Sequence, residues 1–367
     1  MRTNVRFSAF RRALAAMAPL LLLPGVVAFA KKLPAPTRVW SVGPLTKSEP
    51  VMRIAFGAKG ATVTGPYTDS QTESVFAATR SVVFVDDRIV LASQIGMQKV
   101  EGARGPEEAY ELLSLDVKTG QVEARRQIVG VVGIFAADDA HVIVAAQSLL
   151  RLSPDLKDSG SFDYAATGHR FGNVENISPD GSTLGETTSP GFELVDAHTL
   201  KATQLTSAPA VDTSVSNEGF VTDNIHWVGK YPGDLSFVTY VDAKGEHLLY
   251  HGKCGGMPQF LTENLVLEPG CKKPMLIDLH GDIVRTLVVK GGFSFAGVSQ
   301  DGRLFALQVM HTERREQFMI YSVETGEPVA EVAPDEVAEG QSWTAFSPDG
   351  SLFVVGSPPK LTLYRLP

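Results

Sequence analysis

Short apolar runs that alternate with Asp-Gly turns dominate the pattern of hydrophobic and polar positions along this chain. The clearest copies are SPDGSTL at Ser178–Leu184, SQDGRLFAL at Ser299–Leu307 and SPDGSLFVV at Ser347–Val355. An Asp-Gly pair that leads directly into a short apolar run is typical of a tight hairpin between two strands. We therefore predict that the residues of these pairs hold turns and carry out no chemistry: Asp180, Gly181, Asp301, Gly302, Asp349 and Gly350.

Four weaker copies extend this repeat, at Asp86-Asp87, Asp138-Asp139, Glu218-Gly219 and Glu263-Asn264. The second residues of the seven pairs, 87, 139, 181, 219, 264, 302 and 350, lie 38 to 52 residues apart. Between them, further apolar runs end in turns that contain Asp or Gly, as at Leu112–Gly120. Each unit therefore reads as four short strands, which is the blade of a β-propeller.

The last unit supplies only three strands: Trp343–Phe346, Ser351–Gly356 and Leu361–Leu366. Its outermost strand must come from elsewhere, and Thr37–Val42 and Val51–Phe56 near the N-terminus are the two candidates. We predict an all-β fold, a β-propeller of seven four-stranded blades closed by an N-terminal strand. Six or eight blades stay open because several copies of the repeat are degenerate. The Gly- and Thr-rich stretch Gly57–Thr72 is read as a loop.

The first 30 residues differ from the rest of the chain. Four arginines and no acid precede an apolar run at 13–30, which ends in Ala28-Phe29-Ala30. A basic start, an apolar centre and a small-x-small end are the layout of a secretory signal peptide. We expect cleavage after Ala30 and a single propeller domain over 31–367, of which 31–72 holds the closing strand and the loop. The alternative is an uncleaved membrane anchor, which needs about 20 apolar residues, whereas two prolines and a glycine interrupt this run.

Loss of this segment leaves 29 basic residues against 41 acidic ones, a net charge of −12 in place of −8. Because no long run of Lys or Arg is present to neutralise phosphates, nucleic acid is not an expected partner. No second apolar stretch approaches 18 residues, so we expect no integral membrane segment after cleavage. The predicted location is the periplasm or the medium outside the cell.

The SPDGS-x-L phrases resemble the WD40-like repeats of the TolB-type propellers of bacterial periplasmic proteins. The resemblance covers nearly the whole mature chain as periodicity, and three copies show the phrase plainly. It implies a propeller fold and a role as an interaction scaffold. The Thr-Gly turns are also similar to those of quinoprotein propellers, but no Trp follows any of them, so we expect no pyrroloquinoline quinone and no other cofactor.

Cys254 and Cys271 are the only cysteines. The blade template places the first in a connection between two units and the second between the second and third strands of a unit. Both kinds of connection emerge on one face of a propeller, and export brings the pair into an oxidising compartment, so we predict a disulfide between them. The alternative is two free buried thiols.

The same rule defines a candidate binding face, because the longest insertions occur in these connections: Ile95–Glu108, Lys230–Asp234 and His311–Glu316. Loops on a rigid scaffold commonly carry binding, and aromatic and Arg side chains are typical of interaction hot spots. The predicted binding residues are Arg104, Trp227, Tyr231, Arg314, Arg315 and Trp343. The alternative for the two tryptophans is packing between blades.

No catalytic motif accompanies the repeat. Neither a G-x-S-x-G elbow nor an H-E-x-x-H or Walker A pattern is present. His247 and His251 would stand about 13 Å apart on a strand, so no metal site is predicted. We expect a non-enzymatic binding scaffold for a protein or envelope component. The alternative is an enzyme of lactonase, lyase or glycosidase type with its site in the central tunnel, because such residues come singly from each blade and leave no local spacing.

Overall fold

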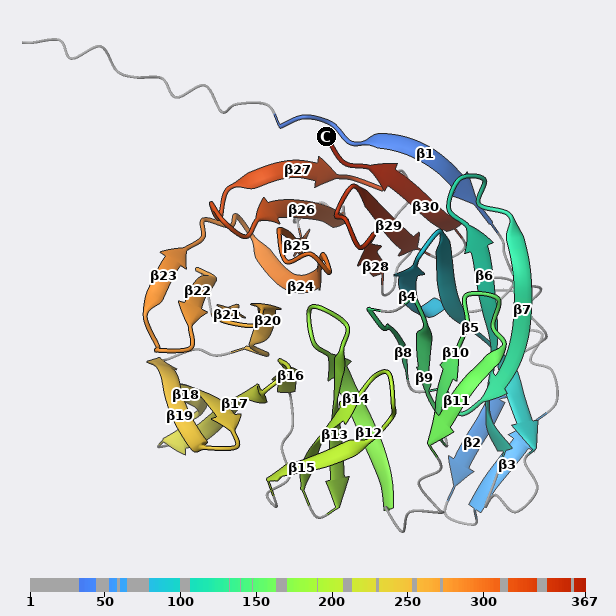
Figure 1. The fold of residues 1–367 in the computed structure, drawn as a ribbon, viewed down its shortest axis with the longest axis horizontal. Coiled ribbons are helices and arrows are strands. Elements are labelled where there is room, and N and C mark those ends of the chain that lie inside the picture. The colour runs from blue at the N-terminus through green and yellow to red at the C-terminus, as the bar shows by residue number, and fades with distance from the viewer. Residues whose placement is uncertain are drawn as a thin grey trace, which may run out of the picture. The chain divides into compact units, whose positions relative to one another are not determined.

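The computed structural model describes these residues: 33–43, 53–57, 60–64, 79–99, 106–131, 133–138, 140–146, 148–162, 170–189, 191–206, 213–228, 231–252, 256–270, 273–310, 316–334, 342–357 and 360–367. Within them, seven four-stranded antiparallel sheets form a ring (Figure 1). The chain is therefore a seven-bladed β-propeller, which confirms the predicted fold class. The predicted signal segment at 1–30 lies outside the described residues.

We number the blades in chain order. Blade 1 consists of β4 (Thr79–Val85), β5 (Arg88–Lys99), β6 (Pro106–Asp116) and β7 (Val122–Val129). Blade 2 consists of β8 (Gly133–Ala136), β9 (Val142–Ala145), β10 (Leu149–Leu152) and β11 (Asp158–Phe162). Blade 3 consists of β12 (Arg170–Ile177), β13 (Thr183–Ser189), β14 (Phe192–Asp196) and β15 (Ala202–Thr206).

Blade 4 consists of β16 (Thr213–Val215), β17 (Gly219–Val228), β18 (Tyr231–Asp242) and β19 (Gly245–Gly252). Blade 5 consists of β20 (Gln259–Thr262), β21 (Leu265–Glu268), β22 (Met275–Asp278) and β23 (Ile283–Thr286). Blade 6 consists of β24 (Gly292–Val298), β25 (Leu304–Met310), β26 (Glu316–Ser322) and β27 (Pro328–Val332). Blade 7 consists of β28 (Trp343–Phe346), β29 (Leu352–Ser357), β30 (Lys360–Arg365) and β1 (Thr37–Val42).

The seven repeated turns all join the first strand of a blade to its second strand. In blade 7 the hydroxyl of Ser347 donates to Asp349 Oδ1 at 2.7 Å, and the backbone N–H of Ser351 donates to the same oxygen at 3.0 Å. The hydrogen bond from Ser347 outweighs burial and holds the pKa of Asp349 below its ordinary value. Gly350 has φ +69°, a conformation that glycine adopts without steric cost. Blades 3 and 6 repeat this arrangement around Asp180 and Asp301.

Ring closure uses one of the two predicted strands. Residues Thr37–Val42 form β1, which pairs antiparallel with β30 from Thr37↔Arg365 to Val42↔Leu361. The second candidate does not close the ring: β2 (Arg53–Gly57) instead pairs with β3 (Gly60–Thr64) in a separate two-stranded sheet. The loop reading of Gly57–Thr72 was therefore wrong at 60–64, where β-branched Thr62, Val63 and Thr64 outweigh the neighbouring glycine. Residues 65–72 lie outside the described part of the chain.

Neighbouring blades pack through apolar side chains on the faces of their sheets. At the junction of the last blade with the first, Val354 and Leu363 of blade 7 cluster with Phe84 and Leu91 of blade 1, and all four are at least 97% buried. Trp40 of β1 reaches over the same junction, because its indole N–H donates to the carbonyl of Val117 at 2.7 Å. The closing strand therefore completes one blade and contacts the next.

Replacement of Trp40 should weaken the ring at this junction. We expect Trp40→Ala to lower the free energy of unfolding by about 2–3 kcal/mol, because a half-buried indole and its hydrogen bond are lost. Val39→Ala on the same strand removes a side chain that is 38% exposed, and should cost less than about 0.5 kcal/mol. Urea unfolding followed by circular dichroism compares the two. Equal stability of both variants would contradict the role assigned to Trp40.

Candidate functional site

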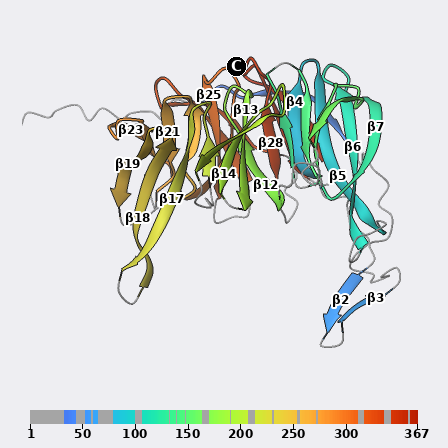
Figure 2. The ribbon, with the colours of Figure 1, turned by 60° about the horizontal axis from the view of Figure 1, so that its bottom comes forward.

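The connections divide the propeller into two faces. The turn face carries the turns between first and second strands and between third and fourth strands. The connection face carries the connections between second and third strands and between blades. Figure 2 shows that the hairpins β5–β6 of blade 1 and β17–β18 of blade 4 both extend beyond the neighbouring strands on the connection face.

These two hairpins replace two of the expected loops. The ladder between β5 and β6 continues to Lys99↔Pro106, and the ladder between β17 and β18 continues to Val228↔Tyr231. The described parts of the predicted insertions Ile95–Glu108 and Lys230–Asp234 are therefore strands, which was not anticipated because their polar residues masked the strand signal. The structure supports these segments by backbone pairing rather than leaving them as loops.

The predicted binding residues are distributed over this face or lie outside the described part. Trp227 belongs to β17 and Tyr231 to β18, next to the end of the long hairpin of blade 4, where the backbone is described. Arg104, Arg314 and Arg315 lie outside the described residues, as do Cys254 and Cys271. Trp343 is partly buried and packs against the apolar cluster between blades 7 and 1, the position of the packing alternative.

Three exposed apolar side chains on the connection face were missed in the sequence. Met257 precedes β20, Val288 follows β23, and Met310 ends β25; they are 51%, 83% and 56% exposed. Met310 is paired with Gly292, and a side chain at Gly291 would meet the carbonyl oxygen of Met310 at 2.9 Å. The connection Leu287–Gly291, which contains Val288, therefore ends close to Met310. Neither an aromatic nor an Arg pattern marks these residues, and only the apolar triplet Leu287-Val288-Val289 in a connection could have signalled them.

A buried carboxylate lies beneath the connection face of blade 5. Glu268 at the end of β21 is fully buried, and its Oε1 accepts the N–H of Gly270 at 3.0 Å. The backbone N–H of Gly256 also donates to this carboxylate. Burial, reinforced by the charge of Asp223 in blade 4, raises the pKa of Glu268 to about 7. One side chain therefore holds both the connection that leads into blade 5 and the connection between the second and third strands of that blade.

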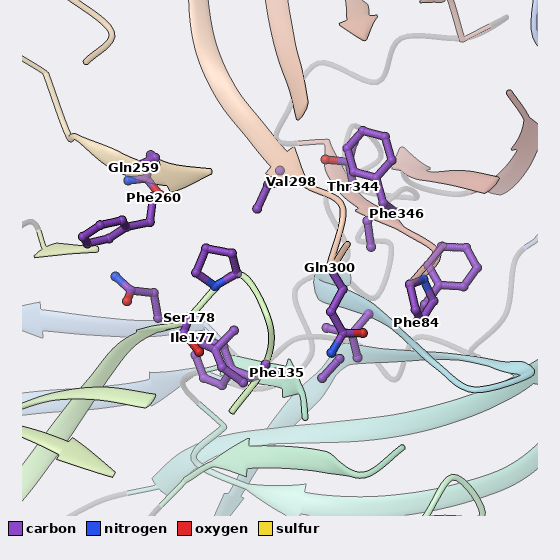
Figure 3. A pocket seen from close by; sticks show the side chains of 18 of the residues that line it. Phe84, Phe135, Ile177, Ser178, Gln259, Phe260, Val298, Gln300, Thr344 and Phe346 are labelled. Carbon is purple, nitrogen blue, oxygen red and sulfur yellow. The ribbon is translucent and has the colours of Figure 1, made fainter. Parts of the chain in front are cut away.

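A central cavity of about 260 Å³ is lined by the first strands of all seven blades and by the turns that follow them in blades 3, 6 and 7 (Figure 3). Its apolar wall includes Phe84, Phe135, Phe295 and Phe346, from four different blades. The polar side chains that line it are all uncharged: Asn176, Ser178, Ser214, Gln259, Gln300 and Thr344.

Several of these polar groups join neighbouring blades. Asn176 of blade 3 donates through Nδ2 to the carbonyl of Thr213 and accepts the N–H of Val215 at 3.1 Å, both in blade 4. Ser214 of blade 4 accepts the N–H of Phe260 at 3.0 Å from blade 5. Thr344 of blade 7 donates to the carbonyl of Ala296 in blade 6. These hydrogen bonds fix the first strands around the cavity.

One hydrogen bond crosses the cavity at the turn face. Gln300, in the repeated turn of blade 6, donates through Nε2 to the carbonyl of Asp180 at 2.7 Å. Asp180 lies three blades away in the turn of blade 3, and Figure 3 shows the Gln300 side chain extending from its turn toward the middle of the site. Gly181 makes room for this contact, because a Cβ there would lie 2.7 Å from Gln300 Nε2. Gln300 therefore bridges the turn-face end of the cavity.

Acidic side chains stand outside this end of the cavity. Asp180 Oδ2 accepts Nδ2 of Asn217 at 2.7 Å, and the backbone N–H of Asn217 donates to Glu263 Oε2 at 2.7 Å. Burial raises the pKa of Glu263, and the charges of Asp180 and Glu218 add to that effect. The cavity lining itself offers hydrogen bonds and apolar contact. Among the described residues, no group of three or more His, Cys, Asp or Glu is arranged to hold a metal ion.

The fold defines the class of the protein, a seven-bladed β-propeller. The chain is similar in structure to a chain in the crystal structure of a mitotic checkpoint complex, with 12% identity, a TM-score of 0.52 and 99% of each chain covered. It is also similar to a chain of hydrazine synthase from Kuenenia stuttgartiensis, with 13% identity and a TM-score of 0.51; that match covers 82% of this chain and 99% of the other. At these identities the similarity shows the fold alone.

No protein-family model matches the sequence, and no curated protein matches it. The described part of the chain contains no helix that is long and apolar enough to span a membrane.

Glu268 should make the stability of the protein depend on pH. Its pKa in the folded protein, about 7, lies above the ordinary value of 4.5. At a pH between these two values, the folded state therefore keeps a proton that the unfolded chain has lost. The free energy of unfolding should therefore fall by about 3 kcal/mol as the pH rises from 4.5 to 7 because of this residue. Glu268→Gln carries no charge, so it should remove this fall and stabilise the protein at pH 8.

Urea unfolding at pH 5 and pH 8 measures the effect. Glu246→Gln, a substitution of an exposed glutamate on β19 of the adjacent blade, should keep the pH dependence of the unaltered protein. If Glu268→Gln shows the same change between the two pH values as Glu246→Gln, the buried carboxylate does not control stability.

Proposed function

We propose that this protein is an exported, non-enzymatic scaffold that binds a partner protein of the cell envelope across its connection face. The observation that carries the proposal is the pair of long hairpins, β5–β6 and β17–β18, which extend from blades 1 and 4 on that face (Figure 2). Extended hairpins on a closed ring present a fixed surface without altering the scaffold, which suits recognition of another protein.

The exposed side chains of the same face support a protein partner. Met257, Val288 and Met310 place apolar surface in water on neighbouring blades, and methionine adapts its shape to irregular partner surfaces. Trp227 and Tyr231 belong to the strands at the end of the hairpin of blade 4, and both residue types are enriched in interaction hot spots. One structural neighbour is described as part of a mitotic checkpoint complex, so the fold is used there within an assembly.

Export and a disulfide form part of the same proposal. The signal-like segment at 1–30 directs the chain out of the cytoplasm. In the oxidising compartment outside, Cys254 and Cys271 form a disulfide. Residues that flank the two cysteines lie together: a side chain at Gly256 would meet Pro269 Cγ at 2.5 Å, and Glu268 binds the N–H groups of both Gly256 and Gly270. This proximity of the flanks supports a bond that fastens two connections of the binding face.

Site-specific photo-crosslinking in the producing cell tests the binding face. A benzophenone-bearing amino acid at Val288 or at Met310 should form a discrete adduct with the partner protein, because both positions are exposed on the connection face. The matched control is Ile283, which is 51% exposed. It follows the turn between the third and fourth strands of blade 5, on the turn face. Adducts from Ile283 that match those from Val288, or none from Val288 and Met310, would contradict the proposal.

Mass spectrometry of the intact protein from the envelope fraction tests export and the disulfide separately. The expected chain begins at Lys31 and resists alkylation at both cysteines until a reductant is added. Reduction should then allow Cys254 and Cys271 to take up one alkyl group each. A chain that still begins at Met1 would refute cleavage, and alkylation of both thiols without reductant would refute the disulfide.

A further inference from the structure

The lining of the central cavity combines phenylalanine rings with uncharged polar side chains. Blades 7, 1 and 2 contribute Phe346, Phe84 and Phe135, and in Figure 3 Phe135 lies beside Ile177, apart from the other two rings. Blades 5 and 6 add Phe260 and Phe295. Blades 4 and 5 contribute Ser214 and Gln259, and the turn of blade 6 contributes Gln300. A ligand in the cavity therefore meets aromatic rings as well as amides and a hydroxyl.

The polar part keeps unused hydrogen-bonding capacity. The side chain of Gln259 has no hydrogen bond to any other described residue, although it lines the cavity. Ser214 accepts the N–H of Phe260, so its hydroxyl proton is left to donate. Gln300 uses one N–H on the carbonyl of Asp180, which leaves its second N–H and its Oε1. Because Phe260 follows Gln259 directly, the Ser214 hydroxyl lies beside the backbone of Gln259.

The bridge from Gln300 to Asp180 gives the cavity a closed end. A ligand that reaches this end meets an amide oxygen as acceptor and an N–H as donor, the pair of groups that a carboxamide complements. Charged ligands find no countercharge in the lining, and a buried ion without a partner is costly. A volume of about 260 Å³ is slightly below the range of sites for drug-sized ligands, so the occupant is small.

We propose that the central cavity is a binding site for a small uncharged organic molecule that carries a carboxamide group on an apolar body. The apolar body packs against the phenylalanines of blades 7, 1 and 2. The carboxamide exchanges hydrogen bonds with Gln259, Ser214 and Gln300.

Three probes of nearly identical shape test the charge and the polar group. Benzamide is neutral, benzoate is its anionic counterpart, and benzamidine is its cationic counterpart. We expect benzamide to bind the full mature protein with a dissociation constant of about 1 mM or lower, as measured by saturation-transfer NMR. Benzoate and benzamidine should each bind at least about tenfold more weakly, because the lining leaves their charges unpaired.

This comparison uses the unaltered protein, so no variant has to fold for it to decide. Absence of saturation transfer to benzamide at about 10 mM would overturn the proposal. Equal or tighter binding of benzoate would overturn it as well. Tighter binding of benzamidine would show that the acids outside the turn-face end, Asp180 and Glu263, govern the site in place of the neutral lining.

Two substitutions at one position place the probe in the cavity. Gln259→Ala removes an amide partner and should weaken benzamide binding about three- to tenfold. Gln259→Trp fills the cavity and should abolish binding. Gln121→Ala changes the same residue type at an exposed position in the turn between the third and fourth strands of blade 1. This substitution should leave the affinity unchanged. Unchanged affinity in both Gln259 variants would show that benzamide binds elsewhere and would overturn the proposal.

Discussion

The pairing of β1 with β30 is the interaction on which the rest of the propeller depends. A blade buries its two faces only against its neighbours, so an open row of blades leaves two apolar faces in water. Here the ladder from Thr37↔Arg365 to Val42↔Leu361 makes the first described strand part of the last blade. Trp40 then binds the carbonyl of Val117 in blade 1, so the same strand joins the last blade to the first. Closure fixes the position of every inner strand.

Closure of the ring also creates the central cavity and determines which side chains line it. The inner strands are joined by hydrogen bonds such as those from Asn176 to blade 4 and from Thr344 to blade 6. These side chains satisfy backbone groups of a neighbouring blade, and uncharged amides and hydroxyls do this without the desolvation cost of an ion. The neutral lining is therefore a consequence of how the blades are joined. The hydrogen-bonding groups that remain, at Gln259 and Gln300, are surplus to that requirement.

The repeat made the fold predictable, because each Asp-Gly turn is a local device. Asp349 accepts hydrogen bonds from residues two positions away on either side, so five residues of sequence contain the whole interaction. The closing strand was predictable too, since the last unit lacked one strand. The bridge from Gln300 to Asp180 was not, because it joins residues 120 positions apart through the centre of the ring. The raised pKa of Glu268 was not predictable either, because its burial and the nearby charge of Asp223 in blade 4 arise from packing within the ring.

The two faces of the ring differ in how strongly the repeat constrains them. On the turn face, blades 3, 6 and 7 need their Ser and Asp residues to form the turn, so substitution there weakens a blade. The connection face carries no such requirement, and the hairpins of blades 1 and 4 extend there without disturbing their sheets. Specific recognition can develop only at positions whose side chains are not needed to maintain the fold. For this reason the residues of the proposed binding face, such as Val288 and Met310, lie outside the repeated turns, whereas the turn residues maintain the ring.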